Sequence, residues 1–433
     1  MSKYFPYNEY KQTEVDWLGV IPVHWDSVKL KFYCKVTDGS HHSPKIESSG
    51  YPFISVSDVG MNSIDFENAK RISEIDYRRL VSEGCKPVSD DLLLTKDGTI
   101  GRACIVTDDM EDFVILSSLG LLSPSDKFSN RYLYYYLISN INVDQMNSMI
   151  HGSALRRMTI NKIDQLIICL PSVVEQDQIA NFLDHETAKI DTLIEKQQQL
   201  INLLKEKRQA VISHAVTKGL NPEVPMKDSG LEWLGGVPAH WDVVKLSYKM
   251  KLLSGDSITS ENIESQGEYR VYGGNGVRGY TNRYNCNGEY VLIGRQGALC
   301  GNINIASGKF FATEHAVVVY PYEGFDTTFL SEFLRFMDLG QYSVSAAQPG
   351  ISVDRINSLK IAVPPQNEQI EIGKTLQNVA SKFEALSSKA NKQITLLSER
   401  RAALISAAVT GKIDVRNWKS NDIKSAEEVE VTV

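Results

Sequence analysis

The sequence lacks the features of a membrane or secreted protein. It has no apolar run near the ~18–20 residues that a membrane-spanning helix needs. Its first ten residues are polar and aromatic, unlike the apolar core of a signal peptide. The six cysteines are scattered and form no CxxC pair, which argues against a zinc ribbon or a disulfide framework. We therefore expect a cytoplasmic protein with reduced, buried thiols and no contact with a membrane.

Positive charge is also in deficit. The chain has 46 Lys and Arg against 53 Asp and Glu, a net charge of −7. A simple basic nucleic-acid binder shows the opposite balance, so any binding to DNA must depend on local basic loops. The 433 residues, 42% of them hydrophobic, suffice for two to four domains at about 100–200 residues each.

The chain contains an internal repeat. A Trp-Leu-Gly…Pro…His-Trp-Asp…Lys-Leu string begins at Trp17 and returns in the same order at Trp233. A Pro…Glu-Gln string that begins at Pro171 returns at Pro364. Each copy spans nearly half of the chain, which is far too long for a solenoid. The pattern indicates a tandem duplication whose edges match and whose middle regions have diverged.

Each half reads as a mixed domain followed by a long helix. Strand-like runs lie between Gly, Asp and Ser turns, and one short helix interrupts them. In the first half the strands are expected at 51–56, 91–95 and 103–106, and the helix at 131–138. In the second half the strands are expected at 269–272, 289–293 and 316–320, and the helix at 328–337. The order favours an α+β fold with α/β-like features.

Two long helices are the clearest structural signal. The long stretch from Pro171 to Val216 contains neither Gly nor a second Pro. Apolar residues follow heptad spacing, which is typical of a coiled coil, although an amphipathic helix packed on its own domain is an alternative. The heptad residues are Ile190, Ile194, Ile201, Leu204 and Val211 in the first helix, and Ala380, Phe383, Ala390, Ile394, Leu397, Leu404 and Ala408 in the second. If the helices pair, connectivity makes them antiparallel, with a domain at each end and an approximate two-fold axis.

Several short sequence motifs resemble those of enzymes, but each lacks the neighbouring residues that its function requires. Residues 274–279 fit GxGxxG, but a polar, turn-rich stretch follows where a dinucleotide site needs a helix. Gly373-Lys374-Thr375 lacks the earlier glycine of a phosphate loop, and no Asn/Asp-Pro-Pro-aromatic methyltransferase signature is present. His24 and His240 have no triad partners, and the pair His41-His42 has no third metal ligand. We therefore predict no catalytic residue and no metal site.

Polar glycine loops in both halves read better as contact surfaces. Loops 96–102 and 295–301 follow equivalent predicted strands, and each places a basic residue beside a glycine turn. Their side chains are of the types that contact base edges and phosphates, although solvated turns are the alternative for any one of them. The leading candidates are Lys96, Thr99, Arg102, Asn275, Arg278, Arg295 and Gln296, and the weaker ones are Ser40, His42, Lys45 and Arg156.

The layout resembles the specificity subunits (HsdS) of type I restriction–modification systems. In that family two variable target-recognition domains alternate with two conserved long helices. The matching strings are the Trp-Leu-Gly…His-Trp openings, the closing 170–180 segment, and the helix ends at 216–219 and 409–412. The second half departs from the pattern at 367–372, where the fuller Ile-Ala ending is missing.

The resemblance implies a division of the chain into five segments. These are target-recognition domain 1 (1–172), a central helix (173–218), a linker with target-recognition domain 2 (219–364), a distal helix (365–412) and a polar C-terminal tail (413–433). Each domain would read one half of a split double-stranded DNA target. The helices would hold the two halves apart by an unread spacer.

The resemblance also implies a chain without an active site or cofactor of its own. Two methyltransferase subunits would carry S-adenosylmethionine, and restriction/translocase subunits would carry ATP and Mg²⁺. Two other interpretations stay open: a nuclease or methyltransferase fused to its own recognition domains, and a coiled-coil scaffold with two protein- or glycan-binding heads. Counterion-linked DNA affinity separates the recognition subunit from the scaffold.

Overall fold

The computed structural model describes residues 4–150, 156–297, 299–343 and 349–419. The chain forms two compact units, which are Met1–Lys196 with Gln393–Val433 (unit 1) and Gln197–Lys392 (unit 2). The units therefore divide within the two long helices, so each unit contains part of both. Among the described residues, no helix is long and apolar enough to cross a membrane.

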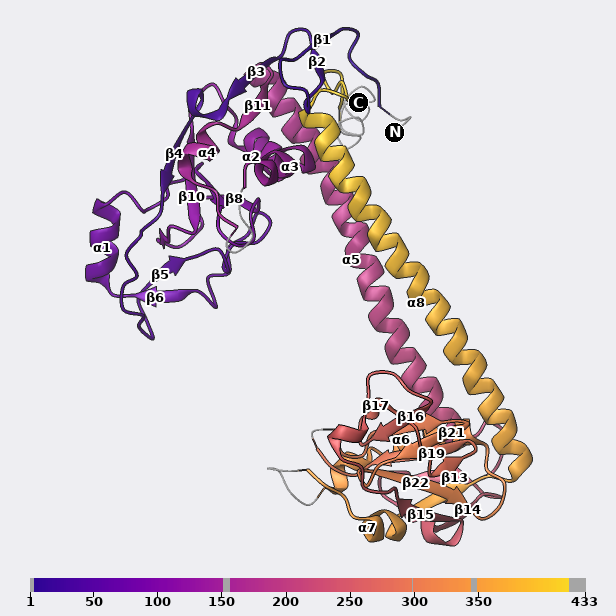
Figure 1. Cartoon of the computed structure of the whole chain (residues 1–433). Coiled ribbons are helices and arrows are strands. Elements are labelled where there is room, and N and C mark those ends of the chain that lie inside the picture. The colour runs from indigo at the N-terminus through magenta and orange to yellow at the C-terminus, as the bar shows by residue number, and fades with distance from the viewer. Residues whose placement is uncertain (1–3, 151–155, 298, 344–348, 420–433) are drawn as a thin grey trace. The chain divides into compact units, whose positions relative to one another are not determined.

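Unit 1 consists of two larger sheets, short helices and a small frame, which is formed by two pairs of strands, β1 with β2 and β3 with β11 (Figure 1). Its main sheet is antiparallel in the order β4-β10-β7-β8. A second sheet has the order β6-β5-β9, with β5 and β9 parallel. The frame and main-sheet strands are β1 (Tyr10–Gln12), β2 (Val20–Pro22), β3 (Asp26–Lys29), β4 (Cys34–Asp38), β7 (Leu92–Thr95), β8 (Ala103–Ile105), β10 (Leu119–Pro124) and β11 (Ile167–Leu170). The others are β5 (Tyr51–Ile54), β6 (Lys70–Ile72), β9 (Val114–Ile115), η1 (Leu30–Phe32), α1 (Glu74–Ser82), α2 (Asn130–Ile138), α3 (Asn140–Ser148) and α4 (Ile160–Asp164).

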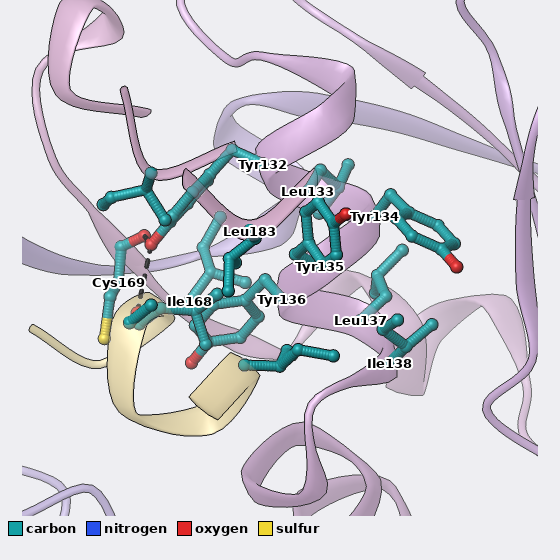
Figure 2. Close-up of a cluster of buried hydrophobic side chains, with 14 of the residues drawn as sticks. Tyr132, Leu133, Tyr134, Tyr135, Tyr136, Leu137, Ile138, Ile168, Cys169 and Leu183 are labelled. Carbon is teal, nitrogen blue, oxygen red and sulfur yellow. Dashed lines mark hydrogen bonds between the residues drawn. The ribbon is translucent and has the colours of Figure 1, made fainter. Parts of the chain in front are cut away.

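The core of unit 1 is built around α2, which is apolar or aromatic on every side (Figure 2). Every residue from Tyr132 to Ile138 is buried. Buried tyrosine hydroxyls need hydrogen-bond partners, and backbone carbonyls supply them. The Tyr132 hydroxyl donates to the carbonyl of Cys169 at 3.0 Å and the Tyr136 hydroxyl to that of Ile167 at 3.1 Å. These bonds attach α2 to β11, the strand that precedes the first long helix.

Unit 2 repeats the frame as two pairs of strands, β12 with β13 and β14 with β23, and its second sheet differs from that of unit 1. Its main sheet has the order β15-β22-β19-β20, and its second sheet has the order β17-β16-β21-β18. The frame and main-sheet strands are β12 (Met226–Asp228), β13 (Gly236–Pro238), β14 (Asp242–Lys245), β15 (Met250–Ser254), β19 (Tyr290–Gly294), β20 (Ile303–Ala306), β22 (Ala316–Pro321) and β23 (Lys360–Val363). The others are β16 (Tyr269–Gly273), β17 (Gly276–Thr281), β18 (Cys286–Asn287), β21 (Lys309–Ala312), η2 (Leu246–Tyr248), η3 (Ser260–Asn262), α6 (Thr327–Phe336), η4 (Leu339–Tyr342) and α7 (Val353–Ser358).

The duplication is visible element by element. Strand β4 returns as β15, and β11 returns as β23, each with the same length as its counterpart. In both units the strand before the long helix pairs antiparallel with the frame strand, β11 with β3 and β23 with β14. All six predicted strands and both short helices are present within a few residues of their expected bounds. The α+β prediction is confirmed.

The long helices are α5 (Val173–Lys218) and α8 (Gln366–Val409). In unit 1 they run antiparallel: Gln178 near the start of α5 donates to the carbonyl of Trp418 beyond α8, and Asp191 pairs with Arg401 at 2.8 Å. In unit 2 the last turns of α5 share a core with the first turns of α8. The predicted heptad residues are buried or half-buried in both helices. Helix α5 ends at Lys218, and Gly219 follows it with a φ of +76°, the left-handed conformation of a helix stop.

The C-terminal segment begins differently from the prediction. A polar tail is expected from residue 413, but Ile413 and Val415 are buried in the core of unit 1. The Asp414 amide donates to the carbonyl of Phe5 at 2.8 Å, and the Trp418 ring lies 5.4 Å from that of Phe182. The apolar side chains of Ile413, Val415 and Trp418 thus pack residues 413–418 against the core of unit 1. Residues 420–433 of the predicted tail lie outside the described residues.

Candidate nucleic-acid interface

In unit 1 the loop between β7 and β8 is held on both sides by backbone hydrogen bonds. The Lys96 amide donates to the carbonyl of Ser118 at 3.1 Å, and the Met158 amide donates to the carbonyl of Lys96 at 2.8 Å. The Gly98 amide donates to the carbonyl of Arg156 at 3.0 Å. The candidate segments around residues 96–102 and 156 are therefore brought together at one end of the main sheet.

Unit 2 repeats these three bonds at the equivalent loop between β19 and β20. The Arg295 amide donates to the carbonyl of His315 and the Ile351 amide to the carbonyl of Arg295, both at 3.0 Å. The Gly297 amide donates to the carbonyl of Pro349, also at 3.0 Å. Gly98 and Gly297 have φ values of +68° and +92°, which glycine adopts without strain. We call this arrangement the loop frame.

A second loop follows β4 in unit 1 and β15 in unit 2, and backbone hydrogen bonds join it to the second sheet of its unit. The Ser40 amide donates to the carbonyl of Ile115, and the Asp256 amide to that of Ala312. A Cβ atom on Gly39 or Gly255 would overlap the neighbouring backbone, so this close approach requires glycine. The segment 38–45, which carries the candidates Ser40, His42 and Lys45, begins beside the candidate loop 96–102, because Oδ1 of Asp38 lies 3.3 Å from Nζ of Lys96.

The prediction that Lys96 faces DNA is wrong. Its side chain is only 1% exposed, and its Nζ lies 3.3 Å from Oδ1 of Asp38 and 3.8 Å from Oδ1 of Asp97. The equivalent Arg295 is half-buried, and its Nη1 donates to Oγ of Ser254 at 3.1 Å. Both basic side chains therefore turn inward and join the ends of two strands.

Two further candidates are also engaged within the protein. Ser40 is buried, and its hydroxyl donates to the carbonyl of His42 at 2.9 Å, so it is wrong as a DNA-facing side chain. Arg102 is half-buried, with its Nη1 3.3 Å from the carbonyl oxygen of Val59. The other candidates are exposed: Thr99, Asn275, Arg278, Gln296, His42, Lys45 and Arg156.

The exposed candidates of unit 2 come from two loops that meet. A Cβ atom on Gly274 would lie 3.2 Å from the carbonyl oxygen of Gln296, so the turn that carries Asn275 adjoins the loop frame. Asn275 accepts from the side-chain amide of Asn302 at 3.2 Å. Arg278 lies on β17, one strand of the second sheet. This strand spans Gly276–Thr281, so the chain is extended at Gly279, where a dinucleotide site would need a helix to begin.

The interface also contains polar residues outside the predicted set. Arg157 is exposed, and its Nε lies 3.3 Å from Oδ1 of Asp97. His41 is exposed and pairs with Asp38 at 3.0 Å. The acidic partners Asp38 and Asp97 stand in the loops that the sequence marks as polar, but only their positions in the fold show that they organise the neighbouring cations.

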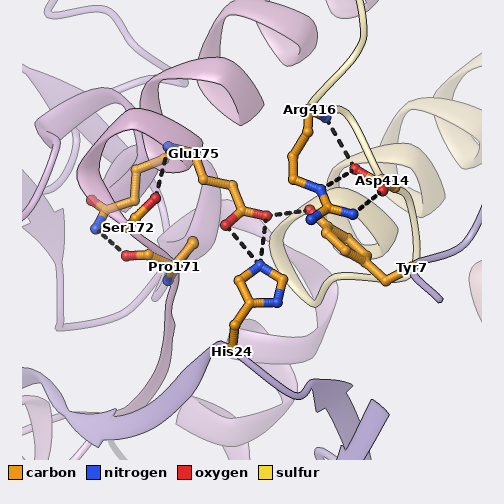
Figure 3. Close-up of polar contacts among 8 residues, drawn as sticks. Tyr7, His24, Pro171, Ser172, Glu175, Asp414 and Arg416 are labelled. Atoms are coloured by element: carbon orange, nitrogen blue, oxygen red, sulfur yellow. Dashed lines mark hydrogen bonds and ion pairs between the residues drawn. The ribbon is translucent and has the colours of Figure 1, made fainter. Parts of the chain in front are cut away.

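The repeated His-Trp and Glu-Gln strings meet at a junction between frame and helix (Figure 3). In unit 1, Glu175 in the first turn of α5 accepts from the Tyr7 hydroxyl at 2.6 Å and lies 3.1 Å from the His24 ring. In unit 2, Glu368 in the first turn of α8 lies 2.7 Å from the His240 ring and accepts from the Trp241 indole at 3.1 Å. Burial and the carboxylate raise the pKa of Tyr7. These histidines attach a helix to its frame.

The part of the chain that the structure describes holds no cluster of three or more His, Cys, Asp or Glu side chains suited to a metal ion. All six cysteines are buried and unpaired.

Comparisons with known proteins agree on one family. Residues 22–203 and 238–396 match the family described as type I restriction modification DNA specificity domain. The type I restriction enzyme EcoprrI specificity subunit of Escherichia coli is 43% identical over 141 residues, which are 32% of this chain and 34% of that protein. This match therefore spans about a third of the relative. The type I restriction enzyme MjaVIII specificity subunit of Methanocaldococcus jannaschii is 22% identical over 92% of this chain and 95% of that protein.

Solved structures show the same fold. A chain from a structure on the complex assembly and conformational transition of a type I R-M system has a TM-score of 0.65 at 16% identity, covering 91% of this chain and 99% of that one. The HsdS subunit from Thermoanaerobacter tengcongensis has a TM-score of 0.54 at 15% identity, covering 91% of this chain and 98% of its own. With both halves matched, the chain belongs to the family of type I restriction–modification DNA specificity proteins.

Proposed function

We propose that this chain reads a bipartite DNA target as the specificity subunit of a type I restriction–modification complex, with one half-site contacted by each unit. The observation that carries the proposal is the loop frame, which occurs in both units with the same three backbone bonds. The backbone bonds of the loop frame are the same in both units, whereas the exposed side chains on these loops differ between the units. A constant scaffold with different reading residues is what two different half-sites require.

The acidic net charge is compatible with this role because charge is distributed locally. Unit 1 exposes Lys45, Arg156 and Arg157 around its loop frame, and unit 2 exposes Arg278. Most phosphate contacts would then come from partner subunits that close around the duplex. The role is non-catalytic: methyltransferase subunits supply S-adenosylmethionine, and restriction/translocase subunits supply ATP and Mg²⁺. We place the assembly in the cytoplasm, where it reaches chromosomal DNA.

The long helices carry a repeated apolar surface that fits two copies of one partner. Leu193 in α5 and Leu386 in α8 occupy equivalent positions of the repeat and are 47% and 48% exposed. Leu203 and Leu396 are equivalent in the same way and are 62% and 47% exposed. Exposed leucines outside the buried heptad positions indicate a contact surface, and their repetition supports two methyltransferase subunits, one on each half.

A titration with duplex DNA at several salt concentrations tests the DNA-binding role. The chain is titrated with and without the methyltransferase subunit of its own system. We expect affinity that falls linearly with log[salt] and a preference for one duplex sequence, both strengthened by the partner. Salt-independent or absent binding in both arms would contradict the proposal and favour a scaffold with protein- or glycan-binding heads.

A further inference from the structure

Each unit exposes one large aromatic side chain at the same point of its frame. Phe32 closes the 3₁₀ helix η1 in unit 1, and Tyr248 closes the equivalent helix η2 in unit 2. Both side chains are 69% exposed. Folding therefore does not account for an aromatic residue at either position, because neither ring fills the core.

Lysines surround both aromatic residues. The equivalent segments 29–35 and 245–251 each contain three lysines and no acidic residue, in a chain whose net charge is −7. Lys29 and Lys35 correspond to Lys245 and Lys251, and all four are exposed. We call each lysine–aromatic–lysine surface a basic aromatic patch.

The repeat retains the aromatic residue and the two flanking lysines of the patch while other positions within it change. The exposed pairs Lys29/Lys245, Phe32/Tyr248 and Lys35/Lys251 are retained, whereas the exposed Lys31 is replaced by Ser247 and the buried Cys34 by Met250. Core positions tolerate such exchanges when volume is adjusted nearby. Within the chain, the Phe32 ring is contacted by Nζ of Lys31 at 5.2 Å, a contact that Ser247 cannot make with Tyr248, so it does not explain the retained aromatic residue. The same exposed pattern in both units points to a shared partner.

The patch lies away from the loops that are proposed to read DNA. Lys35 stands near the start of β4, whereas Asp38 and the loop frame stand at its end, and the same holds for Lys251 and Ser254 on β15. Three residues of strand separate the two positions by about 10 Å. The patch belongs to the frame that β3 forms with β11 and β14 forms with β23, which is the part that joins each long helix.

We propose that the two basic aromatic patches are docking sites for two copies of the methyltransferase subunit, each presenting an acidic surface with a pocket for the aromatic ring. The inference rests on the proposed function and adds a second contact to the exposed leucines of the helices. An aromatic anchor inside a charged rim is typical of the strongest points of protein interfaces. The aromatic ring also favours protein over DNA as the partner, because a phosphate backbone offers no apolar surface that could bury Phe32.

The test measures how many methyltransferase subunits bind each full-length chain. Phe32→Ser, Tyr248→Ser and the double variant are mixed with the methyltransferase subunit of the same system, and masses are measured by sedimentation. Ile75→Ser is the matched control, because Ile75 is 83% exposed but lies on α1 in the diverged region. Lys29→Glu with Lys35→Glu tests the rim of one patch with its aromatic residue intact.

We expect two subunits on the wild type and on the control. Each single variant keeps one subunit at full affinity and binds the second roughly tenfold or more weakly, and the double variant weakens both. The lysine reversal imitates Phe32→Ser. Unchanged binding of two subunits by the double variant would overturn this inference, as would a loss of non-specific duplex affinity with two subunits still bound. A wild type that binds no subunit would instead contradict the proposed function itself.

Discussion

Nζ of Lys96 lies 3.3 Å from Oδ1 of Asp38, so a buried cation joins the ends of β7 and β4 in unit 1. At the equivalent place in unit 2, Nη1 of Arg295 donates to Oγ of Ser254 at 3.1 Å. The equivalent contact is an ion pair in unit 1, whereas in unit 2 a charged guanidinium donates to a neutral hydroxyl. In both units it fixes the base of the two loops that carry the exposed candidate residues.

Removing the cation from each of these contacts has unequal costs. Lys96→Met leaves Asp38 and Asp97 facing a hydrophobic group, and we expect a loss of about 2–3 kcal/mol, below the cost for a fully buried pair because Asp38 is partly solvated. Arg295→Met leaves only a neutral hydroxyl unpaired, at a cost of about 1 kcal/mol. Urea unfolding combined with hydrogen exchange at β7 and β19 measures both. Equal losses, or a Lys96→Met variant that changes only the salt dependence of DNA binding, would contradict a structural role for Lys96.

Arg278 is the strongest remaining candidate for base readout in unit 2, because it is exposed and Arg295 is engaged with Ser254. If Arg278 contacts a base in bidentate geometry, Arg278→Ala costs about 1–3 kcal/mol of discrimination at one or two positions of one half-site. Binding to a library of randomised duplexes reports this change, with Gln296→Ala as a second probe of the same site. Uniform weakening across all duplexes, with a flatter salt slope, would assign Arg278 to a phosphate instead.

The thiols are expected to be unreactive in the folded chain. Burial raises the pKa of Cys34 and Cys169 to about 12 and that of Cys104 to about 11, so the reactive thiolate is scarce at pH 8. Ellman's reagent at pH 8 should therefore react slowly with the native chain. After unfolding in guanidinium chloride, it should react rapidly with all six thiols. Rapid reaction of one or more thiols in the native chain would show that the burial of these side chains is incomplete.

The helices are proposed to act as a ruler for the gap between half-sites. A four-residue insertion after Leu200 in α5, matched by one after Gln393 in α8, lengthens each helix by about 6 Å and adds a rotation of about 40°. Heptad packing absorbs part of this mismatch. We expect both half-site sequences to persist while the gap grows by one or two base pairs. A changed half-site with an unchanged gap would refute the ruler.

Sequence patterns predicted the elements well because local signals determine them. The heptads, the Gly219 stop and the apolar strands need no knowledge of distant residues. The direction of a side chain in a polar loop does depend on distant residues: Lys96 turns inward because it pairs with Asp38, which lies on a different strand. His24 likewise pairs with Glu175, which begins a helix far along the chain. The parallel pairing of β5 with β9 is equally non-local, and no periodicity in the sequence indicates it.

Methylation mapping of DNA from cells that carry the intact system tests the central claim most directly. Two distinct half-sites separated by a gap of fixed length and random sequence are the predicted result, and Arg278→Ala should alter only one of them. A single continuous target, or methylation that does not depend on this chain, would contradict the account.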